Sequence, residues 1–339
     1  MSTQVDSSTA PVTDPGDSGS SPPSSLGTLY RRHREVLRLL VIVAALWVVL
    51  AVMAPHFLTF SNVTNIFINA APLALVAAGL TLVIIAGDLD LSAGSALALV
   101  STVSAILMVD FGVPWVLAFV MGIVLGGVAG LVNGLLVTRI GIPSFITTLA
   151  AMSTLRGIAL LISDGSAVAG LPDPVTALAR TRFVGLPVVL WFPIVVIPVL
   201  GFILSRTNLG LSIYAIGGNR EAARIAGVAI SRTRVTVLTI SGLLAGVAAV
   251  IMTARLGVGS PIIASTLAMD AITAVVIGGT SLFGGAGRMS GTVLGVVLIA
   301  SLQNGLVLLD VSAYWQQIAV GLVLVVAVAI DALSSRRRG

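Results

Sequence analysis

Long apolar runs, separated by short polar segments, account for most of this sequence. A helix of about 20 apolar residues crosses the hydrocarbon core of a bilayer and satisfies its own backbone hydrogen bonds there. The runs lie at about residues 37–54, 67–87, 92–109, 113–137, 144–163, 187–204, 233–255, 268–283, 290–309 and 313–333. We therefore expect an all-α polytopic membrane protein with about ten transmembrane helices.

The composition excludes several other classes of protein. Hydrophobic residues make up 57% of the chain and charged residues only 9%, which is typical of a membrane protein. The chain has no cysteine, so disulfides, thiolate metal sites and thiol catalysis are excluded. It has no lysine, so it cannot form the Gly-x-x-x-x-Gly-Lys-Ser/Thr loop that holds nucleotide phosphates. We expect no catalytic residue, metal or cofactor on this chain, and a partner subunit would hydrolyse any ATP that drives it.

The arginines indicate how the chain is oriented in the bilayer. With the N-terminus inside, the cytoplasmic segments hold Arg31, Arg32, Arg34, Arg38, Arg139, Arg206, Arg220, Arg224, Arg232, Arg234, Arg288, Arg336, Arg337 and Arg338. The outside segments then hold only Arg180, Arg182 and Arg255, and Arg156 falls within a run. Basic residues favour the cytoplasmic side, so both termini are expected in the cytoplasm. The net charge of +5 reports this orientation and not nucleic-acid binding.

The N-terminal segment differs from the rest of the chain. Residues 1–28 are rich in Ser, Thr, Pro, Gly and Asp and contain no apolar run. A segment of this kind cannot bury enough apolar surface to fold. We expect a disordered cytoplasmic tail that transport does not need, followed by one transmembrane domain over residues 29–335.

Two apolar runs end in polar, glycine-rich segments. One is Gly87 to Ser95 and the other is Gly278 to Gly285; each follows a Val/Ile-rich run and precedes a helix of small residues. This likeness hints at an internal repeat. Unwound backbone at membrane depth needs protein or a water-filled cavity around it, and transporters place such breaks along the substrate path. Tight cytoplasmic turns are the alternative explanation.

Few polar side chains are available to contact a solute within the membrane. An unpaired carboxylate there is costly. Each of the three acids near the membrane, Asp88, Asp90 and Asp270, should therefore face water, a helix N-terminus or an arginine. Asp90 is placed either to cap the third span as its N-cap or to contact a ligand, and Asp270 opens the eighth span in the same way. Amides suit a polyhydroxylated solute because they both donate and accept, although they also join helices. The candidate translocation residues are Asp88, Asp90, Ser92, Ser95, Asn133, Asp270, Thr280, Gln303 and Asn304.

A polar, helix-prone segment over residues 217–227 interrupts the apolar pattern between the sixth and seventh spans. A charged helix between two spans is usually retained because another protein binds it. We expect Gly217 and Gly218 to turn the chain into a short cytoplasmic helix that docks a cytoplasmic partner, which the resemblance described below implies is an ATPase subunit. Its docking residues are Gly217, Gly218, Asn219, Glu221, Ala222, Ala223, Arg224 and Gly227, with the small residues seated in a partner groove.

Several motifs in a fixed order resemble a known family. They are Ala86-Gly87-Asp88-Leu89-Asp90-Leu91-Ser92-Ala93-Gly94-Ser95, Asn133-Gly134-Leu135-Leu136-Val137-Thr138, Ile142-Pro143-Ser144-Phe145-Ile146-Thr147-Thr148-Leu149, and the segments 214–227, 270–282, 303–306 and 316–318. The chain resembles the permease subunits of bacterial ABC importers for monosaccharides, in the ribose, xylose, arabinose and galactose branch. Ala86 and Leu89 stand where that family more often has Gly and Ile.

The resemblance implies the ABC importer permease fold, working by alternating access. It implies two cytoplasmic ATP-binding subunits, a second permease copy or a paralogue, and an extracytoplasmic sugar-binding protein. The main alternatives are an ion-coupled secondary transporter, for which only three intramembrane acids are available, and an ABC permease for branched-chain amino acids. A membrane enzyme is disfavoured because no base or nucleophile is suitably spaced.

The orientation is testable because the chain has no cysteine of its own. A cysteine introduced at position 220 should react with a membrane-impermeant maleimide only after the cells are opened. A cysteine within the loop at about 164–186 should react in intact cells. Labelling of position 220 from outside the intact cell contradicts the predicted topology.

Overall fold

The computed structural model describes residues 25–336. The chain divides into two compact units, residues 1–34 and 35–339, and the arrangement described below is that of the second unit. Helix α1 (Ser25–Met53) begins within the segment that was expected to be disordered up to residue 28. The remainder of that predicted tail lies outside the described residues.

Helices account for about three quarters of the described chain, which confirms the predicted all-α class. After α1 come α2 (Phe60–Ile85), α3 (Ala93–Val109), α4 (Trp115–Leu135) with a π-helical turn η1 (Leu136–Ile140), α5 (Ser144–Ile162), α6 (Asp173–Arg180), α7 (Val188–Arg206), α8 (Asn208–Gly218), α9 (Arg220–Ile225), α10 (Ile230–Leu256), α11 (Leu267–Ile277), α12 (Met289–Leu308) and α13 (Ala313–Arg336). A two-residue hairpin of β1 (Arg182–Phe183) and β2 (Leu186–Pro187) pairs antiparallel between α6 and α7.

Every predicted apolar run corresponds to a helix, although the starts of α1 and α2 and the end of α11 differ from the prediction by more than a helical turn. Seven helices within residues 25–336 are long and apolar enough to cross a membrane, and α3, α11 and the first part of α13 are shorter apolar helices. Helix α2 begins at Phe60 and not near 67, because the Thr59 hydroxyl caps its first turn by accepting from the Asn62 amide. Helix α11 ends at Ile277, since Gly279 adopts a left-handed conformation with φ of 85°.

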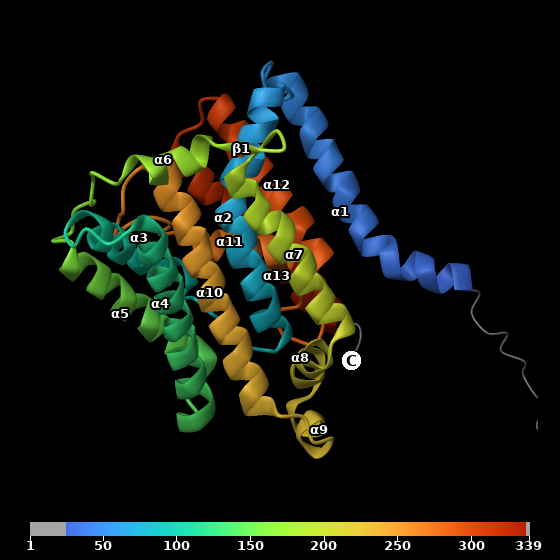
Figure 1. Cartoon of the computed structure of the whole chain (residues 1–339). Coiled ribbons are helices and arrows are strands. Elements are labelled where there is room, and N and C mark those ends of the chain that lie inside the picture. The colour runs from blue at the N-terminus through green and yellow to red at the C-terminus, as the bar shows by residue number, and fades with distance from the viewer. Residues whose placement is uncertain (1–24, 337–339) are drawn as a thin grey trace, which may run out of the picture. The chain divides into compact units, whose positions relative to one another are not determined.

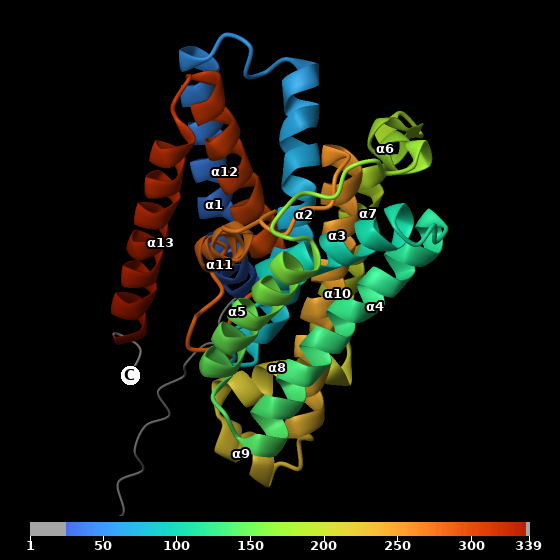
Figure 2. The same cartoon turned by 90° about the vertical axis from the view of Figure 1, so that its left-hand side faces the viewer.

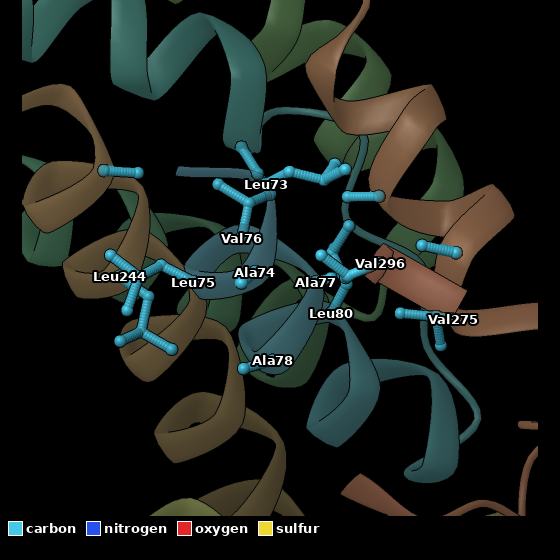
Figure 3. Close-up of a cluster of buried hydrophobic side chains, with 14 of the residues drawn as sticks. Leu73, Ala74, Leu75, Val76, Ala77, Ala78, Leu80, Leu244, Val275 and Val296 are labelled. Atoms are coloured by element: carbon cyan, nitrogen blue, oxygen red, sulfur yellow. The ribbon is translucent and has the colours of Figure 1, made fainter. Parts of the chain in front are cut away.

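Helix α2 is the central helix of the core. Its residues from Ala70 to Ile85 are all buried, as expected for a helix that is apolar on every side. Figure 3 shows Leu73 and Leu80 of α2 among side chains that include Leu244 of α10 and Val296 of α12. Helices α1, α4, α5 and α7 expose long apolar faces, which suits contact with lipid, whereas α10 and α12 are half or more buried.

Glycines bring α4 and α10 into close contact. Gly122, Gly126, Gly130 and Gly134 recur every fourth residue, so they lie along one side of α4. A Cβ on Gly130 would overlap the Leu238 carbonyl oxygen of α10, and the two helices run side by side in Figures 1 and 2. Small residues at this spacing are a known basis of helix association in membranes, and the sequence analysis missed this signal.

The connections gather at two opposite ends of the helices. Helix α6 and the β1–β2 hairpin lie at one end, and α8 and α9 lie at the other (Figures 1 and 2). The segments at about 164–186 and 217–227 are therefore at opposite ends, as the predicted topology requires. Which end faces the cytoplasm remains a prediction from the arginines.

Replacement of Gly130 by leucine tests the close approach of α4 and α10. Overpacking of a tight contact costs about 1–3 kcal/mol, so Gly130→Leu should unfold at a lower temperature in detergent. Gly157→Leu is the matched control, because a Cβ at Gly157 of α5 meets nothing within 4 Å. Equal unfolding temperatures for the two variants contradict the packing that we describe.

Candidate functional site

The end of α2 begins the polar loop, which we define as residues 86–92. The amide of Gly87 donates to the Ile84 carbonyl, and that of Asp88 donates to the Val83 carbonyl. Gly87 has φ of 76°, in the left-handed region that glycine adopts without strain. This hydrogen-bonded ending satisfies the last carbonyls of a buried helix.

Asp88 is buried and paired with an arginine, one of the surroundings predicted for it. The Arg234 guanidinium of α10 donates hydrogen bonds to both carboxylate oxygens, with Nε 2.7 Å from Oδ2 and Nη2 2.5 Å from Oδ1. Arg220, the first residue of α9, has Nη2 3.8 Å from the same Oδ1. The sequence analysis gave Arg234 only a topological role and placed Arg220 at the rim of the docking helix, although a buried acid was a signal that a cation lay nearby.

Asp90 holds three elements together through hydrogen bonds. Its Oδ1 accepts from the Ser92 amide at 3.0 Å and the Ser92 hydroxyl at 2.6 Å, and its Oδ2 accepts from Ser241 of α10 at 2.7 Å. The Ser92 hydroxyl accepts in turn from the Asn133 amide of α4 at 2.9 Å. Asp90 is not the N-cap of α3, which corrects one of its two predicted roles: Ser92 occupies that position, because the helix begins at Ala93.

Two side chains of α5 form hydrogen bonds with the backbone of Leu89, in the middle of the polar loop. The amide of Leu89 donates to the Ser144 hydroxyl at 3.3 Å, and the Thr148 hydroxyl donates to the Leu89 carbonyl at 3.1 Å. The polar loop is thus bonded to α4, α5 and α10, and Arg220 of α9 lies within ion-pair distance.

The second predicted break has the same geometry as the first. The amide of Gly279 donates to the Val276 carbonyl and that of Thr280 to the Val275 carbonyl, which repeats the bonds of Gly87 and Asp88 residue for residue. Helices α9 and α12 end with the same pair of bonds, so this ending is no evidence for the internal repeat, which stays a prediction. Thr280 takes the place of Asp88, and its buried hydroxyl has no partner within the described part of the chain.

Three segments meet where these helices end. Gly217 is the penultimate residue of α8 and packs on the end of α2, because a Cβ there would overlap the Ile85 carbonyl oxygen. That carbonyl accepts from the Gly285 amide at 2.9 Å. The Tyr214 hydroxyl of α8 donates to the Gly287 carbonyl at 2.7 Å. Burial raises the pKa of Tyr214, against a lowering effect of Arg288, so this donor keeps its proton at neutral pH.

The predicted docking helix is shorter than expected, and the turn that precedes it lies at a different residue. It spans Arg220–Ile225 only, because Gly217 and Gly218 end α8 instead of opening a turn. The turn is at Asn219, whose side-chain oxygen caps α9 by accepting from the Ala222 amide at 2.9 Å.

The faces of α9 correct one predicted docking residue. Ala223 is only 4% exposed, so it packs against its own chain and cannot seat in a partner groove. The exposed surface includes Ala222, Glu221 and Arg224, the last two joined by an ion pair of 2.6 Å. Ile225, which the sequence analysis did not single out, is 81% exposed. An isoleucine in a polar segment was the available signal.

The remaining pathway candidates lie away from the polar loop. Gln303 of α12 donates to Asp270 at 3.3 Å, and Thr266 donates to the same carboxylate oxygen at 3.4 Å. Thr266 is the N-cap of α11, so Asp270 lies within the first turn and does not open the helix. Asn304 forms a paired amide contact with Asn62 of α2 at 2.9 and 3.0 Å, which joins two helices. Ser95 is buried in the first turn of α3.

The chain is similar to transport permeases over most of its length. A family model described as "Branched-chain amino acid transport system / permease component" matches residues 62–328. The ribose import permease protein RbsC of Bacillus subtilis is 40% identical over 286 residues, which are 84% of this chain and 88% of that protein. The D-allose transport system permease protein AlsC of Escherichia coli is 38% identical over 281 residues, 83% of this chain and 86% of the relative.

A more distant relative covers still more of the chain. The L-arabinose transport system permease protein AraH of Escherichia coli is 34% identical over 314 residues, which are 93% of this chain and 95% of that protein. No solved structure matches the chain. The family model over residues 62–328 and these relatives show that the chain belongs to the ABC importer permease family that includes the ribose, allose and arabinose permeases, which confirms the resemblance found in the sequence, and its apolar helices make it a multi-pass membrane permease.

Proposed function

We propose that this chain is the membrane-spanning subunit of an ATP-driven importer that moves a monosaccharide into a bacterial cell. The observation that carries the proposal is the similarity, over 83% of the chain or more, to permeases named for ribose, D-allose and L-arabinose. The absence of lysine agrees with it, since ATP hydrolysis then falls to a separate subunit.

The ATPase subunit docks on α9, with both chain termini on the same cytoplasmic side. Ile225 and Ala222 supply an apolar surface that a partner groove can enclose, Asn219 caps the helix, and the buried Ala223 packs it against its own chain. Glu221 and Arg224 already pair with each other, and exposed pairs contribute only about 0–1 kcal/mol. Apolar contact therefore dominates this interface.

The remaining partners occupy the other free surfaces. A second permease copy or a paralogue completes the transmembrane pathway, and a sugar-binding protein delivers the solute at the end formed by α6 and the β1–β2 hairpin. Docking forces on α9 rock the helices between outward-facing and inward-facing states. We place solute contact at Asp270 and Gln303, which are only half-buried, in preference to Asp88 and Asp90, whose oxygens are already bonded within the chain.

Uptake measurements test the proposed solute class. The permease is expressed with its ATP-binding subunit and binding protein in cells that lack their own sugar permeases. Labelled D-ribose, D-allose, L-arabinose and L-leucine are offered in turn. We expect one of the sugars to accumulate, and only with an intact ATPase subunit. Accumulation of leucine alone would favour an amino-acid permease, and uptake that persists without the ATPase subunit would favour ion coupling.

A charge placed at Ile225 tests the docking surface. Burial of an isoleucine side chain contributes about 1.5–3 kcal/mol, so Ile225→Asp should weaken binding of the ATPase subunit by about tenfold or more. Co-purification of the two subunits measures the effect. Glu221→Gln on the same helix should cost far less. Native binding by Ile225→Asp would place the docking site elsewhere.

A further inference from the structure

The Asp88 carboxylate is shared between two arginines of very different exposure. Arg234 lies on α10 with only 11% of its side chain exposed, and its two bonds to Asp88 are short. Arg220 lies on α9 with 48% of its side chain exposed, and its nitrogen is 3.8 Å from Asp88 Oδ1. The first contact is a charge-assisted bidentate pair, whereas the second is a weak, adjustable one.

We propose that the contact between Arg220 and Asp88 is the adjustable link through which movement of the ATPase-docking helix α9 reaches the polar loop. Asp88 then acts as a positioning residue and not as a solute-binding group. This inference rests on the proposed docking of an ATPase subunit on α9. It adds to that proposal the residues through which the docking movement is transmitted into the membrane domain.

The position of Arg220 fits this role. It is the first residue of α9, so a small tilt of the helix changes its distance to a fixed carboxylate directly. Asp88 is fixed because Arg234 and the end of α2 hold it from the other side. Closer approach by Arg220 strengthens its attraction to Asp88 at the expense of the bond from Arg234, since both nitrogens face Oδ1.

The backbone around the link cannot absorb such a movement by local shifts. The end of α8 lies against the Ile85 carbonyl at Gly217, where there is no space even for a Cβ. The Gly285 amide bonds the same carbonyl at 2.9 Å. A displacement of α8 and α9 therefore acts on the ends of both broken helices together, and Arg220 determines how strongly the polar loop follows.

The polar loop connects Asp88 to a second hydrogen-bond network, around Asp90. Two residues further along, Asp90 is bonded to Ser92 at the start of α3 and to Ser241 of α10. Asn133 of α4 joins the same network through Ser92. A shift of the polar loop thus bears on α3, α4 and α10.

The test follows the polar loop directly in the complete transporter. Leu89→Cys introduces the permease's only cysteine at a half-buried position of the loop. The permease is purified with its ATP-binding subunits, and maleimide labelling of the permease band is timed with and without ATP and orthovanadate. We expect the nucleotide to change the labelling rate. Arg220→Gln should reduce that change about fivefold, as loss of a contact worth about 1 kcal/mol implies, without loss of the ATPase subunit.

Three matched variants separate the link from a general loss of charge. Arg220→Lys keeps the cation and should retain most of the response. Arg232→Gln removes an exposed arginine of α10 for which the described residues show no ion pair, and it should retain the full response. Asp88→Asn combined with Arg234→Gln replaces the buried ions with two amides, which avoids an unpaired buried charge, and should lose the response as Arg220→Gln does.

The possible results distinguish this inference from the docking proposal. Equal responses from Arg220→Gln and Arg232→Gln overturn the inference. So does a labelling rate at position 89 that the nucleotide does not change in the transporter with native Arg220. If Arg220→Gln releases the ATPase subunit, Arg220 is a docking contact, so the link is refuted while docking on α9 stands. If Ile225→Asp leaves subunit binding intact, it is the docking proposal that fails.

Discussion

Two apolar helices, α2 and α11, end in residues that are mostly buried, so most of the polar backbone groups released there must be satisfied within the protein. An unsatisfied backbone group in an apolar interior costs several kcal/mol. Both helices meet this constraint with the same ending, in which a left-handed glycine allows its own amide and the next one to bond back to the last turn. The third segment, at the end of α8, is held against these endings by its own glycine. The proposed docking helix α9 follows directly, so its place in the molecule depends on this constraint.

The fold class and the existence of the apolar helices were predictable from the sequence because hydrophobic run length is a local property. The boundaries were less predictable. The first two turns of α2 contain Ser61, Asn62, Thr64 and Asn65, which the apolar pattern excludes, although Thr59 caps them and Asn62 bonds Asn304. Helix α8 was missed because it follows α7 after a single residue, Thr207. The glycine spacing on α4 was visible in the sequence, but it could not be interpreted without knowing that α10 packs against it.

The candidate site was predicted as a set of polar residues, but the structure separates that set. Asp88, Asp90, Ser92 and Asn133 belong to or adjoin one loop, Asp270 and Gln303 form a second group, and Asn304 joins two helices. Arg234 and Ser241 complete the first group although they lie about 150 residues away in sequence. Pairings of such long range leave no local pattern, which is why single-sequence reasoning found the acids and missed their partners. The orientation of Ala223 was likewise not predictable before the ends of α9 were known.

The two buried acids of the polar loop are stabilised in different ways. Asp88 meets guanidinium groups near the α9 end of α10, where partial exposure of Arg220 lets water and a docked partner influence the pair. Asp90 lies two residues further along the loop at 1% exposure, and it meets only hydroxyl and amide donors. Ionic contacts vary steeply with distance and screening, whereas a network of short neutral donors holds a fixed geometry. The loop therefore has one end suited to respond to movement and another suited to position helices, and this asymmetry gives the route from α9 to α3 its direction.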